Sequence, residues 1–266
     1  MAAPKLRIDN VAALIADGGA NRTGRLSPNE RLAVACRIAG VTQLCNRFAV
    51  FIGPESDTVP PEDVFLNDLL GGTEHATDEI RVSVDAILEV LDTGLFSSRG
   101  LNRIGWAHQT YAEFPAARYC KKRAMPLRQI RPLIFHPSEG GRRLILQLRE
   151  IAGWMSATDP DILEAVATSD PEALLGAAAA GLSENERRLI VDSLLGRTSE
   201  GRTLHLEWGL VSQYPKLKHA KLSENGERRV QLVLPSAAAL SHVWLTFEPK
   251  LAGLCRFPVY ETLFRA

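Results

Sequence analysis

Signals for the start of a helix recur along this chain, and they limit its fold more than any other feature. The strongest is Ser27-Pro28-Asn29-Glu30, because a Ser27 hydroxyl can accept from the third backbone N–H while Glu30 reaches back to the cap. Similar starts follow at Asp159-Pro160, at Asp170-Pro171 and at Ser183. Short capped helices in series predict a mainly α fold with an α-helical repeat, or solenoid-like, arm.

Apolar residues at helical spacing predict where the helices lie. The expected helical segments are 28–46, 62–70, 77–94, 109–124, 126–135, 142–157, 161–168, 171–179, 184–195 and about 203–214. Thr77 is expected to cap the third of these segments, and Gly94 to end it. Pro115 falls inside 109–124, where it removes a backbone hydrogen bond and costs roughly 3 kcal/mol or produces a kink.

The spacing of the apolar residues changes after Gly94. Leu95-Phe96 and the segment 101–107 have the pattern of two short strands around a turn. A helix that leads into a β-hairpin is how a winged-helix domain ends. We therefore expect a helical, winged-helix-like region at 1–107, a helical-repeat arm at 108–222, and a divergent C-terminal tail at 223–266.

Charge is balanced over the chain but not along it. Lys plus Arg and Asp plus Glu number 31 each, so no global field favours a nucleic acid or a membrane. Residues 1–98 hold 8 basic and 14 acidic groups, whereas residues 99–150 hold 11 and 3. The basic segment is expected to meet the acidic segment or a protein partner; the alternative is that it grips nucleic-acid phosphate. The candidate contacts are Arg99, Arg103, Arg118, Lys121, Lys122 and Arg123, with Arg128 and Arg131 following.

The sequence contains no pattern typical of catalysis. Neither a phosphate-binding Gly-x-x-x-x-Gly-Lys-Ser/Thr loop nor a Gly-x-Ser-x-Gly elbow occurs in it. The Gly-rich stretch 18–24 lacks the lysine of a phosphate loop and is read as a plain loop. His108 and Glu113 are five residues apart, which misaligns them on a helix, and His205 with Glu207 lacks a third metal ligand. We expect a protein that is not an enzyme and that needs neither a cofactor nor a metal.

Four cysteines, Cys36, Cys45, Cys120 and Cys255, form no close pair, which favours a reduced, cytoplasmic setting. Buried packing is the expected role of Cys120. The alternative is a thiol whose pKa is lowered by the neighbouring Lys121, Lys122 and Arg123. The N-terminus lacks an apolar signal core and no 18-residue apolar run occurs, so we expect no membrane contact.

Several stretches resemble one family. Gly94-Leu95-Phe96, the segment from Ile104 to Phe114, and Ala116 to Tyr119 look like the part that follows the nucleotide-binding core in bacterial NACHT-type STAND NTPases. In that family a β-wing ends in an aromatic-x-His-Gln stretch and leads into a Glu-Phe-x-Ala-Ala-x-Tyr helix. The resemblance covers about residues 26–222. It implies a sensor or regulatory segment whose arm recognises a ligand and controls an NTPase core, often in antiviral defence.

This chain departs from that family by lacking the phosphate loop, so the ATPase activity does not carry over. The hypothesis is a truncated member with a protein- or ligand-recognition role in defence signalling, whose partner is a protein or the missing NTPase domain. The alternative is a winged-helix nucleic-acid-binding protein that uses the basic 99–131 segment. His108 and Glu113 are the candidate hinge residues: His108 is expected to bond a backbone carbonyl, and Glu113 to reach a neighbouring helix.

Overall fold

The computed structural model describes residues 11, 13–15, 26–55, 58–76, 79–137, 143–175, 182–199 and 217. Of these residues, 59% are helical and 12% lie in strands. The protein is therefore mainly α, as the helix-starting signals predict.

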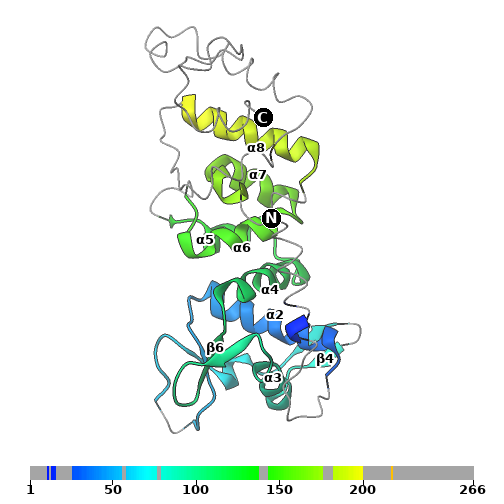
Figure 1. Cartoon of the computed structure of the whole chain (residues 1–266), viewed down its shortest axis with the longest axis vertical. Coiled ribbons are helices and arrows are strands. Elements are labelled where there is room, and N and C mark those ends of the chain that lie inside the picture. Colours follow the sequence, from blue (N-terminus) through cyan, green and yellow to red (C-terminus); the bar gives the residue numbers. More distant parts are fainter. Residues whose placement is uncertain are drawn as a thin grey trace.

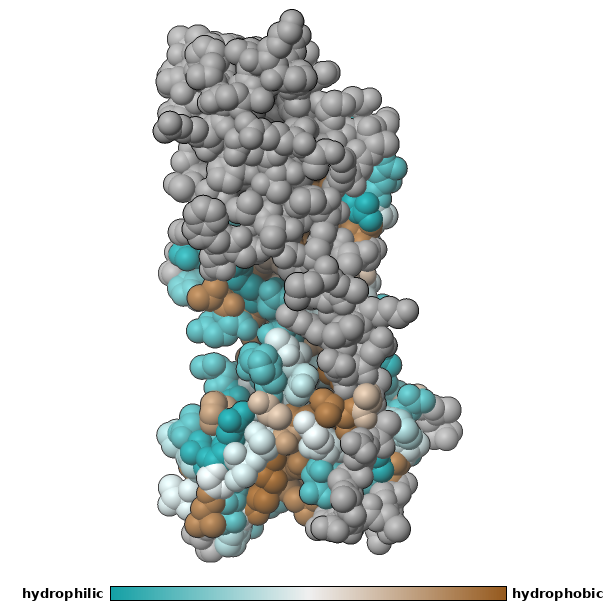
Figure 2. Space-filling view, viewed as in Figure 1, coloured by the Kyte–Doolittle hydropathy of each residue, from teal (hydrophilic) through white to brown (hydrophobic). Residues whose placement is uncertain are grey.

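The described part of the chain is elongated (Figure 1). Its helices are α2 (Pro28–Leu44), α3 (Val84–Leu91), α4 (Gln109–Lys122), α5 (Leu127–Ile134), α6 (Arg149–Ser156), α7 (Pro160–Ser169) and α8 (Glu184–Ser199). Its strands are β1 (Val50–Phe51), β2 (Val64–Phe65), β3 (Thr73–His75), β4 (Glu79–Arg81), β5 (Phe96–Ser98) and β6 (Arg103–Trp106). The strands lie with α2 and α3 at one end, and α4, α6, α7 and α8 follow one another along the long axis. Apolar side chains gather on the surface at the end that holds α3 (Figure 2).

Helix α2 begins with the predicted capping box. The Ser27 hydroxyl accepts from the backbone N–H of Glu30, and the backbone N–H of Ser27 donates to the Glu30 carboxylate at 2.7 Å, which lowers the pKa of Glu30. Farther along, Val34 and Ile38 are fully buried. Arg31 bonds Glu89 of α3 at 2.9 Å, so the start of α2 is tied to α3 as well.

Four strands form one sheet in the order β2-β1-β6-β5, with β1 and β2 parallel and the other pairs antiparallel. The hairpin predicted after Gly94 is present as β5 and β6. Phe96 lies opposite Trp106 and the two ring centroids are 4.3 Å apart. The Trp106 indole N–H donates to the Thr42 hydroxyl at 3.1 Å, and this buried bond holds the hairpin on α2.

The helix predicted from Thr77 is wrong in its first half. Residues 79–81 form strand β4, which pairs with β3, and α3 begins only at Val84. The alternation in β4 buries Ile80 and exposes its neighbours, which suits a strand with one apolar face. Ser83 is the cap of α3, because its hydroxyl accepts from the backbone N–H of Ala86. Thr77 itself lies outside the described residues.

The helix predicted at 62–70 is also wrong. Strand β2 occupies its first part, and only a 3-10 helix, η1 (Leu66–Leu69), follows. The Val64 N–H donates to the carbonyl of Ala49 across the sheet. Pairing with β1 therefore overrides the local helical spacing.

The helices predicted at 109–124, 126–135 and 184–195 are present as α4, α5 and α8. Helix α7 begins after Asp159, whose carboxylate accepts from the backbone N–H groups of Asp161 and Ile162, as its Asp-Pro start predicts.

Of the two helices predicted at 142–157 and 171–179, the first is shorter than predicted and the second begins as a 3-10 helix. The 142–157 helix starts only at Arg149, after the 3-10 helix η3 (Leu146–Leu148) and an isolated bridge between Phe135 and Leu144. In the 171–179 segment the structure describes a 3-10 helix, η4 (Pro171–Leu175). The helix predicted at about 203–214 and the tail at 223–266 lie outside the described residues.

Helix α4 runs continuously through Pro115, which has no backbone N–H to donate to the carbonyl of Tyr111, as expected from the sequence. Pro115 is buried, and the neighbouring Ala112 and Ala116 are fully buried. Small residues also bring α4 close to α2. A Cβ added to Gly40 would lie 2.3 Å from Cδ1 of Tyr119, so only glycine fits there without a shift of that ring.

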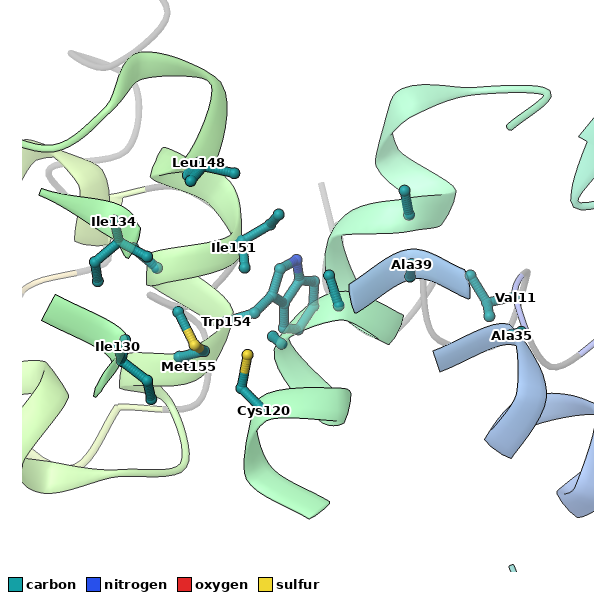
Figure 3. Packing of buried hydrophobic residues seen from close by; sticks show 14 of the residues in the cluster. Val11, Ala35, Ala39, Cys120, Ile130, Ile134, Leu148, Ile151, Trp154 and Met155 are labelled. Atoms are coloured by element: carbon teal, nitrogen blue, oxygen red, sulfur yellow. The ribbon is translucent and has the colours of Figure 1, made fainter. Parts of the chain in front are cut away.

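The hydrophobic core continues from the strand end through α4 to α6. Figure 3 shows Trp154 of α6 facing α4, with Ile151 and Met155 on its own helix and Cys120 on the far side of the contact. The Trp154 ring meets the Phe114 ring edge-on, with centroids 5.5 Å apart. Helix α4 therefore packs on α2 with one face and on α6 with another.

Candidate partner interface

Arg103, on β6, is held by acidic side chains from the start of β2. Its guanidinium bonds the Asp63 carboxylate through two nitrogens, at 2.6 and 2.9 Å, and bonds Glu62 at 2.9 Å. The Asp63 side chain is fully buried, and its hydrogen bond raises the pKa of Arg103. A planar fork on a carboxylate is the strong form of this contact. Arg103 is thus already engaged by the acidic segment.

Arg99, on the turn between β5 and β6, is exposed and donates to the backbone carbonyl of Trp106. Its guanidinium carbon lies 5.7 Å from the centre of the Phe48 ring, and that of Arg103 lies 5.9 Å from the same centre. Phe48 is 57% exposed and Leu101 at the tip of the turn is 87% exposed. The hairpin therefore presents apolar surface together with its positive charge.

Two other sequence-predicted contacts lie at the far end of α4. Arg123 bonds the Glu74 carboxylate on β3 at 2.5 Å, and the same oxygen accepts from Arg37 of α2 at 3.2 Å. Lys122 donates to the backbone carbonyl of His75. The basic end of α4 is therefore fastened to the β3–β4 hairpin by a buried carboxylate and one carbonyl.

The remaining cations of the basic segment differ in exposure. Lys121 is exposed and makes no ion pair within the described ranges. Arg118 is half-buried, and its Nε–H meets no acceptor among the residues described. Arg128 and Arg131 lie exposed on α5, with Arg131 over the Phe135 ring at 5.2 Å. The predicted set thus does not form one patch: Arg99 and Arg103 lie on the β5–β6 hairpin, and the others on α4 and α5.

The two candidate hinge residues have different surroundings. His108 is the N-cap of α4: its Nδ1 accepts from the backbone N–H of Thr110 at 3.3 Å, where a bond to a carbonyl was expected. Its ring is exposed and lies 5.9 Å from that of Tyr111. Glu113 is buried on α4. His108 thus fixes where α4 begins, immediately after the hairpin.

The thiols of Cys36 and Cys120 are buried in the core. Cys36 and Cys120 are both 1% exposed, and burial raises their pKa values to about 12 and about 11. The alternative of a lowered pKa for Cys120 is therefore wrong, because burial removes the hydration that would stabilise the thiolate. Within the described part of the chain, no three His, Cys, Asp or Glu side chains are placed to hold a metal ion. None of the described helices has the length and apolar character needed to cross a membrane.

Sequence reasoning missed the acidic partners of these cations. Asp63 and Glu74 belong to the acidic segment that was expected to meet the basic one, but the position of Asp63 directly before β2 and that of Glu74 within β3 were not predicted. In β3 the buried residue is Glu74, between the exposed Thr73 and His75, so the sequence shows no apolar alternation that would mark this strand. Comparison with protein families, with curated proteins and with solved structures gives no match to this chain.

Proposed function

We propose that this chain is a non-enzymatic regulatory segment, in which a winged-helix-like unit is joined through α4 to a solenoid-like helical arm. Binding of a ligand or protein at the arm is transmitted through α4 to a partner protein. The observation that supports this most directly is the packing of α4 on α2 and α6 at once. A helix that packs in two parts of the core moves with both of them. Binding at the arm therefore shifts the conformational equilibrium of the end that holds the strands.

The topology supports the winged-helix-like interpretation of the strand end. Helix α3 leads directly into the β5–β6 hairpin, and β1 pairs with the inner strand β6. Successive packing of α4, α6, α7 and α8 supports the repeat-like arm (Figure 1). The resemblance to NACHT-type STAND proteins adds the expected setting, a cytoplasmic defence-signalling protein whose partner is another protein or an NTPase domain.

The test is native-state hydrogen exchange on the full chain carrying Trp154→Ala. This change removes the aromatic contact between α6 and α4, at an expected cost of about 3–5 kcal/mol for a buried tryptophan. If α4 couples the two ends, amides of α2 and β6 lose as much protection as those of α6. Leu146→Ala, at an arm side chain that is 71% exposed, is the matched control and should leave protection unchanged. Loss of protection confined to α6, α7 and α8 would contradict the proposal.

A nucleic-acid-binding role is the second candidate, favoured by the exposed Lys121 and Arg128, which lack ion pairs within the described ranges. Fluorescence anisotropy with a labelled 20-base-pair duplex, read at rising salt, tests it. Each cation on a phosphate adds about −0.9 to the slope of log K against log salt, so Lys121→Ala with Arg128→Ala should reduce that slope by about 2. An absence of binding at low salt would remove this candidate.

A further inference from the structure

An apolar groove opens at the strand end of the molecule, where Figure 2 shows apolar side chains gathered over α3. Its volume is about 280 Å³. It is lined by Ile52, Gly53, Glu55, Phe65, Leu66, Asn67, Val84 and Leu88. Small-molecule and cofactor sites usually span roughly 300–1,000 Å³, so this groove suits one or two anchoring side chains better than a cofactor.

The walls of the groove come from elements that hold each other in place. The parallel strands β1 and β2 both end at it, and Phe65 packs on Phe51 with ring centroids 6.4 Å apart. A Cβ added to Gly53 would lie 2.5 Å from Cζ of Phe51, so glycine is needed for that ring to keep its place. Val84, in the first turn of α3, is 42% exposed although it is apolar. The groove is therefore formed without its occupant.

The charge at the groove is negative. Glu55 is the charged member of the lining, which includes no cation, and the exposed Asp68 follows Asn67 on η1. Like-charge repulsion disfavours an acidic ligand in this groove. A ligand with an apolar side chain and a neighbouring cation is favoured, because the side chain contacts the apolar walls and the cation is attracted to the acidic groups.

We propose that this groove docks a basic amphipathic segment of a partner protein, with one or two apolar side chains in the groove and a Lys or Arg beside Glu55. The proposal rests on the function argued above, for which it names the contact that holds the partner. Apolar anchors in a pocket are the residues that dominate protein–protein binding, and a charge at the rim sets the choice of partner.

Methyl NMR of the full chain tests the proposal with two amidated tripeptides, Lys-Trp-Lys and Glu-Trp-Glu. They share the apolar anchor and differ in the sign of their charge. Lys-Trp-Lys should shift the methyl signals of Ile52, Val84 and Leu88 and bind at least about fivefold more tightly than Glu-Trp-Glu at low salt.

Two pairs of variants locate that effect. Glu55→Gln should remove the preference for Lys-Trp-Lys while the methyl shifts remain, and Glu164→Gln, at an exposed acid on α7, should leave the preference intact. Val84→Ala should weaken both peptides about threefold or more, and Leu101→Ala on the β5–β6 turn should weaken neither.

Equal binding of the two peptides, or shifts that avoid the groove, would overturn the proposal. A concentration-dependent dimer whose formation shifts the same methyls, and which Val84→Lys disrupts, would overturn it too, because a second copy would then be the occupant. Either result leaves the hydrogen-exchange test of α4 coupling untouched, so failure of the groove and failure of the proposed function are distinguishable.

Discussion

The carboxylate of Glu74 accepts from two arginines, and the structure predicts that they contribute unequally. Arg37 lies 3.2 Å from Glu74 Oε1 with its side chain 16% exposed, whereas Arg123 lies 2.5 Å away but is 42% exposed. Shortening the separation from 3.2 to 2.5 Å raises a Coulomb energy by roughly a quarter. Moving from an effective dielectric of about 20 toward that of water, about 80, lowers it about fourfold. Burial therefore outweighs distance, and the longer pair is the stronger one.

Double-mutant cycles measure this difference as changes in the free energy of unfolding. Glu74→Gln combined with Arg37→Met should give a coupling energy of about 1.5–3 kcal/mol, the range for hydrogen bonds to charged groups in buried settings. Glu74→Gln combined with Arg123→Met should give less than about 1 kcal/mol, as for a solvated pair. Urea denaturation of the four proteins in each cycle provides the values.

Lys121→Met is the matched control for these cycles, because Lys121 lies on the same helix and makes no ion pair within the described ranges. Its coupling to Glu74→Gln should be close to zero. A coupling for Arg123 that exceeds that for Arg37 would refute the reasoning, since distance would then decide the strength of the pair. Added salt should reduce the Arg123 coupling more than the Arg37 coupling, because solvated charges are screened more strongly.

Three further predictions concern α2 and α4, each read by urea or thermal denaturation. Pro115→Ala should raise the free energy of unfolding by about 1 kcal/mol, because a regained hydrogen bond to the Tyr111 carbonyl outweighs the lost burial of the ring; a decrease would show that the ring matters more. Gly40→Ala should lower stability by about 1–3 kcal/mol, because its Cβ would meet the Tyr119 ring at 2.3 Å. The third prediction uses the pKa of Cys36, which burial raises to about 12. Above about pH 9 the thiol ionises in the unfolded chain but stays protonated in the folded protein. The contribution of Cys36 to the free energy of unfolding is therefore complete below that pH and falls by about 1.4 kcal/mol per pH unit above it. Cys36→Ala should make this decline less steep, and an unchanged slope would contradict the assignment.

Local signals predicted the elements whose ends are fixed by their own side chains. The capping box at Ser27 and the Asp159 cap each satisfy backbone N–H groups within three residues, so sequence spacing alone locates α2 and α7. The β5–β6 hairpin was found for the same reason, because its strands are joined by a short turn. His108 was predicted as a hinge residue. Its role as the N-cap was not predicted, because that role follows from the position at which α4 begins and no sequence motif indicates it.

Long-range pairing was not predictable in detail. Strand β2 forms because Val64 and Phe65 pair with Val50 and Phe51, and strand β4 forms because it pairs with β3. The sequence of each segment also fits helical spacing, and that spacing does not indicate which strand lies next to the segment in the fold. The acidic excess of 1–98 and the basic excess of 99–150 did indicate that the two segments are complementary. The Arg103–Asp63 and Arg123–Glu74 pairs, 40 and 49 residues apart, are the form that this complementarity takes. Because those carboxylates are buried, their cations are held by the fold itself. A partner that recognises this molecule therefore meets charges that stay exposed, among them Arg99 on the β5–β6 turn, Lys121 and Arg128 on the helical side, and Glu55 at the apolar groove.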